Sequence, residues 1–159
     1  FKRMRLSRNF MLREFVNSAT AARKGISNKP TEVHLANLKK LIDNVIQPVR
    51  DKIGPIRITS GYRSPALNRA IGGSSRSQHS KGMAADIQFV RDNEMDNKVI
   101  FDTILEMGLD FDQMINEFDY SWIHISYNPK KNRKQVLEAY KDDNNKTKYR
   151  EVQTNFKGL

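Results

Sequence analysis

The chain has 159 residues, which is typical of one domain that buries about two-thirds of the surface its unfolded chain exposes. It contains no cysteine, which excludes disulfide frameworks, thiolate metal sites and cysteine nucleophiles. Its formal net charge of +10 favours an anionic partner such as nucleic acid, anionic lipid or a carboxylate-rich cell-wall polymer, although a solvated basic surface explains the charge equally well.

The hydropathy pattern predicts a soluble chain without membrane insertion. No stretch approaches the roughly 20 consecutive apolar residues of a membrane-spanning helix. The residues from Phe1 to Arg5 lack the apolar core of a signal peptide. The cellular compartment is left open, because a targeting segment upstream of Phe1 would not be visible in this sequence.

Two helical segments are predicted before the first strand. Apolar residues recur among polar ones over 7–24, which indicates a short helix within an N-terminal helical arm of about residues 1–30. Thr31 is a suitable N-cap for a longer amphipathic helix, whose leucine, isoleucine and valine residues repeat at steps of three and four. Pro48 cannot donate a backbone hydrogen bond, so a kink or break is expected near Gln47.

Four strands and two helices are predicted between residues 55 and 127. Alternating apolar and polar side chains place the strands at 55–60, 85–90, 111–118 and 121–127. Ser64 and Pro65 suit the N-cap and the first position of a short helix. Asp92 or Asn93 would cap a second helix, whose apolar face begins at Met95.

A terminal hairpin completes the predicted elements. Strand patterns lie on both sides of the polar turn 142–145, and the hairpin is expected over about residues 131–153. Helices beside several short strands, without regular alternation of strand and helix, are typical of an α+β domain. The sequence therefore predicts a single domain over 1–159, in which helices pack against a mainly antiparallel sheet.

Two of the three histidines lie beside or within predicted strands: His79 shortly before the strand at 85–90, and His124 inside the strand at 121–127. In the stretch 77–86, Ser-Gln-His-Ser-Lys-Gly-Met-Ala-Ala-Asp, the glycine permits a tight reversal between His79 and Asp86. A hydrolytic zinc site needs three nitrogen or oxygen ligands and an open position for water, and His79, Asp86 and His124 would supply these ligands. A histidine alone is usually a surface or packing residue, which is our expectation for His34.

These motifs resemble those of the zinc D-Ala-D-Ala carboxypeptidase family, whose relatives include vancomycin-resistance dipeptidases, phage L-alanyl-D-glutamate endolysins and the Hedgehog signalling domain. The family signature S-x-H-x-x-G-x-A-x-D followed by W-x-H is complete at 77–86 and 122–124. The stretch 58–68 is also similar, so the resemblance spans about residues 7–127. It implies the Hedgehog and D-Ala-D-Ala-peptidase fold, with zinc held by the two histidines and the aspartate of the signature.

The resemblance also implies roles outside the metal set. Glu117 would be the general base, but its separation from the last histidine is longer than in many relatives, so Asp119 is the alternative. Arg63 would stabilise the oxyanion or anchor a substrate carboxylate, or else bond loop carbonyls as a structural residue. Ser77 would bind substrate or only cap its loop, and Trp122 would form a pocket wall or pack in the core.

The implied substrate is the stem or cross-link peptide of peptidoglycan, cleaved by a monomeric zinc peptidase that acts at the cell wall or in the periplasm, or that a phage encodes. The bond cleaved, and the choice between carboxypeptidase and endopeptidase, stay open. A zinc-binding recognition domain without activity would carry the same motifs but no working base at Glu117. A basic nucleic-acid-binding protein is suggested by charge alone, and because no recognition helix or zinc-finger spacing supports it, no nucleic-acid partner is expected.

Overall fold

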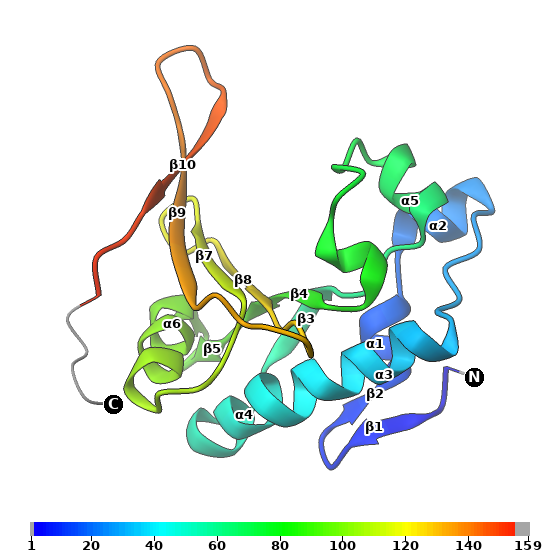
Figure 1. Cartoon of the computed structure of the whole chain (residues 1–159), viewed down its shortest axis with the longest axis horizontal. Helices are drawn as coiled ribbons and strands as arrows, with labels where there is room; N and C mark the ends of the chain where they lie inside the picture. The colour runs from blue at the N-terminus through cyan, green and yellow to red at the C-terminus, as the bar shows by residue number, and fades with distance from the viewer. Residues whose placement is uncertain (1, 155–159) are drawn as a thin grey trace.

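The computed structural model describes residues 2–154, and its centre is a six-stranded sheet with helices on one face (Figure 1). The strand order is β10-β9-β7-β8-β4-β3, and every neighbouring pair is antiparallel except β7 with β9. The strands are β3 (Arg57–Ser60), β4 (Ala84–Gln88), β7 (Gln113–Glu117), β8 (Trp122–Ser126), β9 (Gln135–Lys141) and β10 (Thr147–Glu151). The predicted α+β class with a mainly antiparallel sheet is confirmed.

Helices and two small ribbons surround this sheet. The helical segments are α1 (Leu12–Val16), α2 (Ala19–Lys24), α3 (Glu32–Leu41), the π-helix η1 (Ile42–Ile46), α4 (Gln47–Ile53), α5 (Pro65–Ala70), the 3-10 turn η2 (Gln78–Lys81) and α6 (Asn97–Glu106). The ribbons pair β1 (Arg5–Ser7) with β2 (Phe10–Met11), and β5 (Val90–Arg91) with β6 (Glu94–Met95). Within residues 2–154, no helix combines the length and apolar character that crossing a membrane requires.

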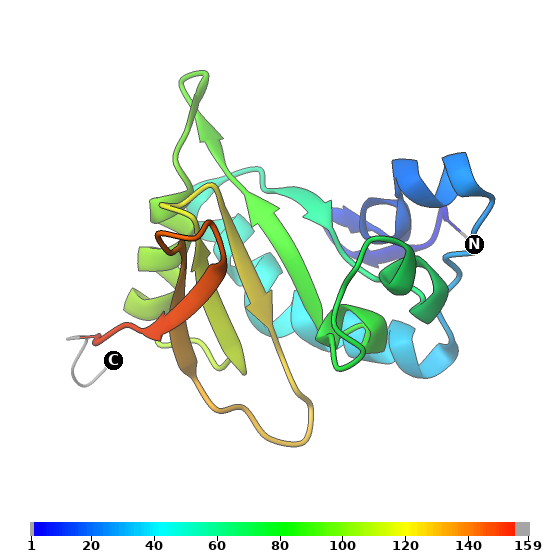
Figure 2. The ribbon, with the colours of Figure 1, turned by 90° about the horizontal axis from the view of Figure 1, so that it is seen from above.

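The core lies between the sheet and the helices α3, η1, α4 and α6, which lie behind the sheet in Figure 2. Alternate residues of the central strands, among them Ile87, Ile123 and Ile125, are fully buried in it. Successive side chains of a strand project to opposite faces, so their sequence neighbours project to the open face. Asp86 pairs with His124 across that face. Burial of the isoleucines therefore decides which face the polar residues line.

The helix predicted over 7–24 is wrong in its extent. The first residues of this range belong to the β1–β2 ribbon, and two short helices, α1 and α2, replace the single helix. The break has a local cause, because Ser18 is extended and its Oγ accepts a hydrogen bond from the Ala21 N–H at 3.1 Å, which caps α2. Gly25 then ends α2 with φ +65°.

The long helix neither breaks nor stops at Pro48. It continues from α3 through η1 into α4, and the Gln47 N–H bonds the carbonyl of Ile42, five residues earlier. This wide turn accommodates a proline that lacks a donor and whose ring would clash with a regular helix. Thr31 caps the start as predicted: its Oγ1 accepts the His34 N–H and its own N–H is donated to His34 Nδ1, both at 3.2 Å. His34 is thus a capping residue.

The helix predicted after Asp92 or Asn93 begins later, at Asn97. Asp92 and Asn93 have φ of +53° and +64° and form the turn between β5 and β6. Short polar side chains tolerate this left-handed conformation, which explains why the pair serves a turn instead of a cap. Met95 consequently lies in β6 and is 48% exposed, not on a buried helix face. Gly108, with φ +63°, follows the end of α6.

Candidate metal centre

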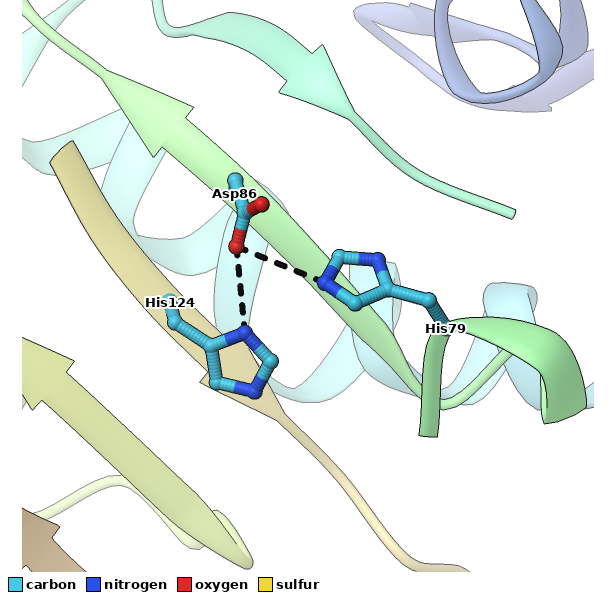
Figure 3. A group of neighbouring side chains, drawn as sticks. All are labelled: His79, Asp86 and His124. Carbon is cyan, nitrogen blue, oxygen red and sulfur yellow. Dashed lines mark hydrogen bonds and ion pairs between the residues drawn. The ribbon is translucent and has the colours of Figure 1, made fainter. Parts of the chain in front are cut away.

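Three side chains from separate parts of the chain meet on the open face of the sheet (Figure 3). Asp86 on β4 and His124 on β8 are direct cross-strand neighbours, and Asp86 Oδ1 lies 3.0 Å from His124 Nδ1. His79 on η2 brings its Nε2 within 3.4 Å of the same oxygen. Ligand atoms from the three residues lie within 4.8 Å of one another, so the group is placed to hold one metal ion.

Backbone contacts fix the His79 ring. Its Nδ1 lies 2.7 Å from the Gly61 carbonyl oxygen, so Nδ1 carries the proton and Nε2 keeps its lone pair for the centre. Burial lowers the pKa of His79, although the nearby Asp86 carboxylate acts in the opposite direction. The net effect favours the neutral ring that a metal ligand requires. Gly61 can occupy this position because it has no side chain. A Cβ at residue 61 would lie 2.5 Å from the carbonyl oxygen of Phe15, on which Gly61 packs.

Asp86 lies beside a bulge at the edge of the sheet. The β3–β4 register shifts between Ile58 and Ser60, a device that redirects side chains near functional sites. Burial alone would raise the pKa of Asp86, but the neighbouring imidazoles of His124 and His79 hold it well below its usual range. The centre therefore offers an ionised carboxylate and two imidazoles, which are typical nitrogen and oxygen ligands of a divalent metal ion.

Gly82 ends the turn that carries His79. It has φ +74° and packs on α3, where an added Cβ would collide with the His34 carbonyl oxygen. Gly82→Ala is expected to lower the free energy of unfolding by about 3 kcal/mol, because overpacking adds to the strain of a positive φ. Gly72→Ala is the matched control: Gly72 has φ +77° but nothing within 4 Å of a Cβ, so its loss should be about 1 kcal/mol. Urea denaturation compares the two variants, and equal losses would contradict the collision.

The candidate metal centre opens into a cavity of about 650 Å³ on the open face of the sheet, a size typical of small-ligand sites. The segment around η2 forms one side and the β9–β10 hairpin forms the other, and Figure 1 shows both rising above the strands β8 and β4 that lie between them. Besides the three candidate ligands, the lining residues are Arg63, Ser74, Arg76, Ser77, Gln78, Gln113, Ile115, Glu117, Phe118, Trp122, Arg133, Leu137, Thr147 and Tyr149.

The two candidate bases lie in different surroundings. Glu117 ends β7, lines the cavity and is 8% exposed. Burial raises its pKa to about 6, with His124 opposing the shift and the charge of Asp86 adding to it. Asp119 is exposed and does not line the cavity. It lies in the turn that separates β7 from the last histidine, where residues 118–120 all have positive φ. Burial and position in the cavity wall therefore favour Glu117 over Asp119 as the candidate general base.

A family model described as peptidase M15 matches residues 8–126, about three quarters of the chain. The chain belongs to the peptidase M15 family. The match contains the three candidate ligands and Glu117, and it confirms at family level the resemblance seen in the motifs. Membership makes the chain a peptidase by class. No curated protein matches it significantly.

Three further residues predicted for the site of this M15 peptidase line its cavity. Arg63 Nε is buried without a hydrogen-bond partner among residues 2–154, so this nitrogen is not committed to a loop carbonyl. Ser77 Oγ accepts the His79 N–H at 3.2 Å and caps η2, which is one of its two predicted roles. Trp122 packs against Phe118 at the cavity wall, with ring centroids 5.6 Å apart, and is only partly buried.

The raised pKa of Glu117 predicts how the stability of the metal-free M15 peptidase depends on pH. The folded state favours the protonated form of Glu117. Protonated Glu117 therefore adds to the free energy of unfolding below pH 4.5, and this stabilisation is lost as the pH rises through about 6. Above about pH 7, Glu117→Gln should be more stable than the wild type by about 2 kcal/mol, and below about pH 4 the two should be alike. Chemical denaturation after chelator treatment measures this, and a glutamine variant that is less stable at neutral pH would contradict it.

Sequence reasoning missed Asp112, a carboxylate that is 3% exposed. It accepts hydrogen bonds from Gln78 Nε2 at 2.8 Å and from the backbone and guanidinium of Arg133 at 3.0 Å. Its own N–H bonds the Ser126 carbonyl at 2.8 Å. Asp112 thus joins the turn and the strand that carry the two histidines to the segment before β9. No motif marks it, because its partners are far apart in the sequence.

Proposed function

We propose that this M15 peptidase is a monomeric zinc metallopeptidase that hydrolyses a peptide bond in the stem or cross-link of peptidoglycan. The observation that carries the proposal is the meeting, in one cavity, of a His-Asp-His group with a buried glutamate. Zinc suits this donor set, because catalytic zinc sites commonly use three imidazole or carboxylate ligands and leave one position open. The orphaned Nε of Arg63 supplies a cationic donor in the same cavity.

The proposed chemistry assigns one role to each group. When held by His79, Asp86 and His124, zinc would lower the pKa of a water molecule and polarise the substrate carbonyl. Glu117, with a pKa of about 6, is ionised at neutral pH, takes the proton of the attacking water and returns it to the leaving amine. Arg63 donates to the developing oxyanion or to a substrate carboxylate, for which a planar guanidinium is suited.

Two residues would position the peptide. Ser77 uses its oxygen to cap η2, which leaves its hydroxyl proton available to a polar group of the substrate. Trp122 offers a flat apolar surface, steadied by Phe118, beside Glu117. Both residues lie in the cavity wall, so neither has to move far to contact a ligand.

Digestion of purified sacculi tests the proposal. Mass spectrometry of the released muropeptides should show one type of cleaved bond, among D-Ala-D-Ala, D-Ala-diaminopimelate and L-Ala-D-Glu, and a chelator should abolish the products. Re-addition of zinc should restore them. Zinc binding without any product would instead favour a recognition domain that has lost activity.

The net charge of +10 predicts salt-dependent attachment to the anionic wall. Raising the salt concentration from about 0.05 M to about 0.5 M should weaken binding to sacculi at least about tenfold, because screening shortens the reach of surface charges. Co-sedimentation measures this, with duplex DNA titrated in parallel. Salt-indifferent binding to sacculi would contradict the prediction, and tighter salt-dependent binding to DNA would favour a nucleic-acid partner.

A further inference from the structure

The β9–β10 hairpin lies beyond the residues that match the family, yet it forms one wall of the cavity. Leu137 of β9, with Thr147 and Tyr149 of β10, lines the cavity opposite η2. Figure 1 shows the turn of the hairpin rising above β7 and β8, on the side away from α5. A segment outside the matched region therefore supplies part of the surface that a substrate would meet.

The register of the sheet places Tyr149 in one row with the proposed base. Tyr149 pairs with Ala139, Ala139 with Glu117, and Glu117 with Trp122. Residues paired directly across strands project to the same face, so all four side chains project to the cavity face. Neighbouring strands lie roughly 4.8 Å apart, so two strand spacings, roughly 10 Å, separate Tyr149 from Glu117 along the sheet.

The side chains around Tyr149 leave its ring free to meet a ligand. Ala139, which stands between it and Glu117, is 1% exposed and puts only a methyl group in the way. Tyr149 itself is 55% exposed, an unusual state for a large aromatic side chain that lines a cavity. Partial burial and the charges of Glu117 and Asp86 raise the pKa of Tyr149, which agrees with a phenol that faces the centre.

We propose that the β9–β10 hairpin is the second wall of the substrate site and that Tyr149 contacts the bound peptide. The inference rests on the proposed peptidase function and adds a substrate requirement to it. At roughly 3.3 Å per extended residue, the distance of roughly 10 Å corresponds to about three residues. The substrate is therefore a stem peptide that extends about three residues beyond Glu117, and a dipeptide is too short to reach Tyr149.

Steady-state kinetics on a muropeptide with a four-residue stem tests this inference. Tyr149→Ala is expected to raise KM about tenfold with kcat changed less than about twofold, because the ring binds the peptide away from the reacting bond. Tyr149→Phe keeps the ring and should raise KM only about threefold. As a competitive inhibitor, a D-Ala-D-Ala dipeptide should bind the wild type and Tyr149→Ala equally.

Tyr140→Ala is the matched control, because Tyr140 follows Ala139 on β9, projects to the other face under Arg150 and does not line the cavity. It should change neither KM nor kcat, and zinc content and thermal stability are measured for every variant. If the wild type is active and Tyr149→Ala has an unchanged KM, the hairpin does not contact the substrate through Tyr149, but the proposed peptidase function is unaffected. The inference would also be wrong if Tyr149→Ala and Tyr140→Ala raised KM equally, or if Tyr149→Ala weakened dipeptide binding as much as it weakened binding of the muropeptide. A zinc-loaded wild type that cleaves no muropeptide would remove the function and this inference together.

Discussion

Glu117→Gln is expected to lower kcat for muropeptide hydrolysis by about 10³-fold and to leave zinc binding unchanged. Glutamine keeps the size of the side chain in the cavity wall but cannot accept a proton. In the wild type, burial raises the pKa of Glu117 to about 6, so the side chain is ionised at neutral pH and its conjugate acid can still protonate the leaving amine. Steady-state kinetics with parallel zinc analysis measures both parts of the prediction.

Asp119→Asn is the matched control for this experiment. Asp119 is two residues away, carries the same charge and lies exposed on the β7–β8 turn outside the cavity. Its replacement should leave kcat within about twofold of the wild type, since surface substitutions away from a site rarely matter. Loss of activity in Asp119→Asn together with normal activity in Glu117→Gln would show that Asp119, not Glu117, is the general base.

His124→Ala should abolish both zinc binding and hydrolysis. The remaining pair, His79 and Asp86, supplies only two protein ligands, where zinc sites use three or four. We expect zinc affinity and hydrolysis each to fall by at least about 10³-fold, because ligand bonds supply most of the binding free energy of such sites. Zinc retained after dialysis, measured by atomic absorption, and muropeptide hydrolysis are followed in the same preparations.

The third histidine provides the control for that variant. His34 lies in the first turn of α3, where its Nδ1 accepts the Thr31 N–H and its ring packs on Tyr62. His34→Ala should lower the free energy of unfolding by about 1 kcal/mol through the lost cap, with zinc content and activity unchanged. Zinc loss in His34→Ala with zinc retained in His124→Ala would refute the ligand set.

The parts of the site that were predictable from sequence are those that depend on local geometry. Gly82 is required for a reversal within one short stretch, and the alternation along β4 and β8 places Asp86 and His124 on the face opposite the buried isoleucines. Both inferences use only neighbours in sequence and the period of a strand. The ribbon turn at Asp92 and Asn93 shows the limit of this approach, because the same residues suit a helix cap and a left-handed turn.

The parts that could not be predicted depend on contacts between distant segments. The insertion of β9 parallel to β7, between β7 and β10, brings Tyr149 into the row of Glu117, and no local pattern encodes that strand order. Asp112 likewise acquires its partners only when the segments of Gln78 and Arg133 come together. The continuation of the long helix past Pro48 depends on a π-turn, which helical periodicity does not reveal.

Zinc titration of the metal-free protein, with muropeptide hydrolysis followed at each step, tests the proposed zinc peptidase most directly. The rate should rise in proportion to bound zinc and saturate at about one ion per chain, as expected for a single three-ligand centre. Glu117→Gln should bind the same amount of zinc without gaining activity. Full hydrolysis by the metal-free protein, or saturation with zinc that yields no hydrolysis, would contradict the account.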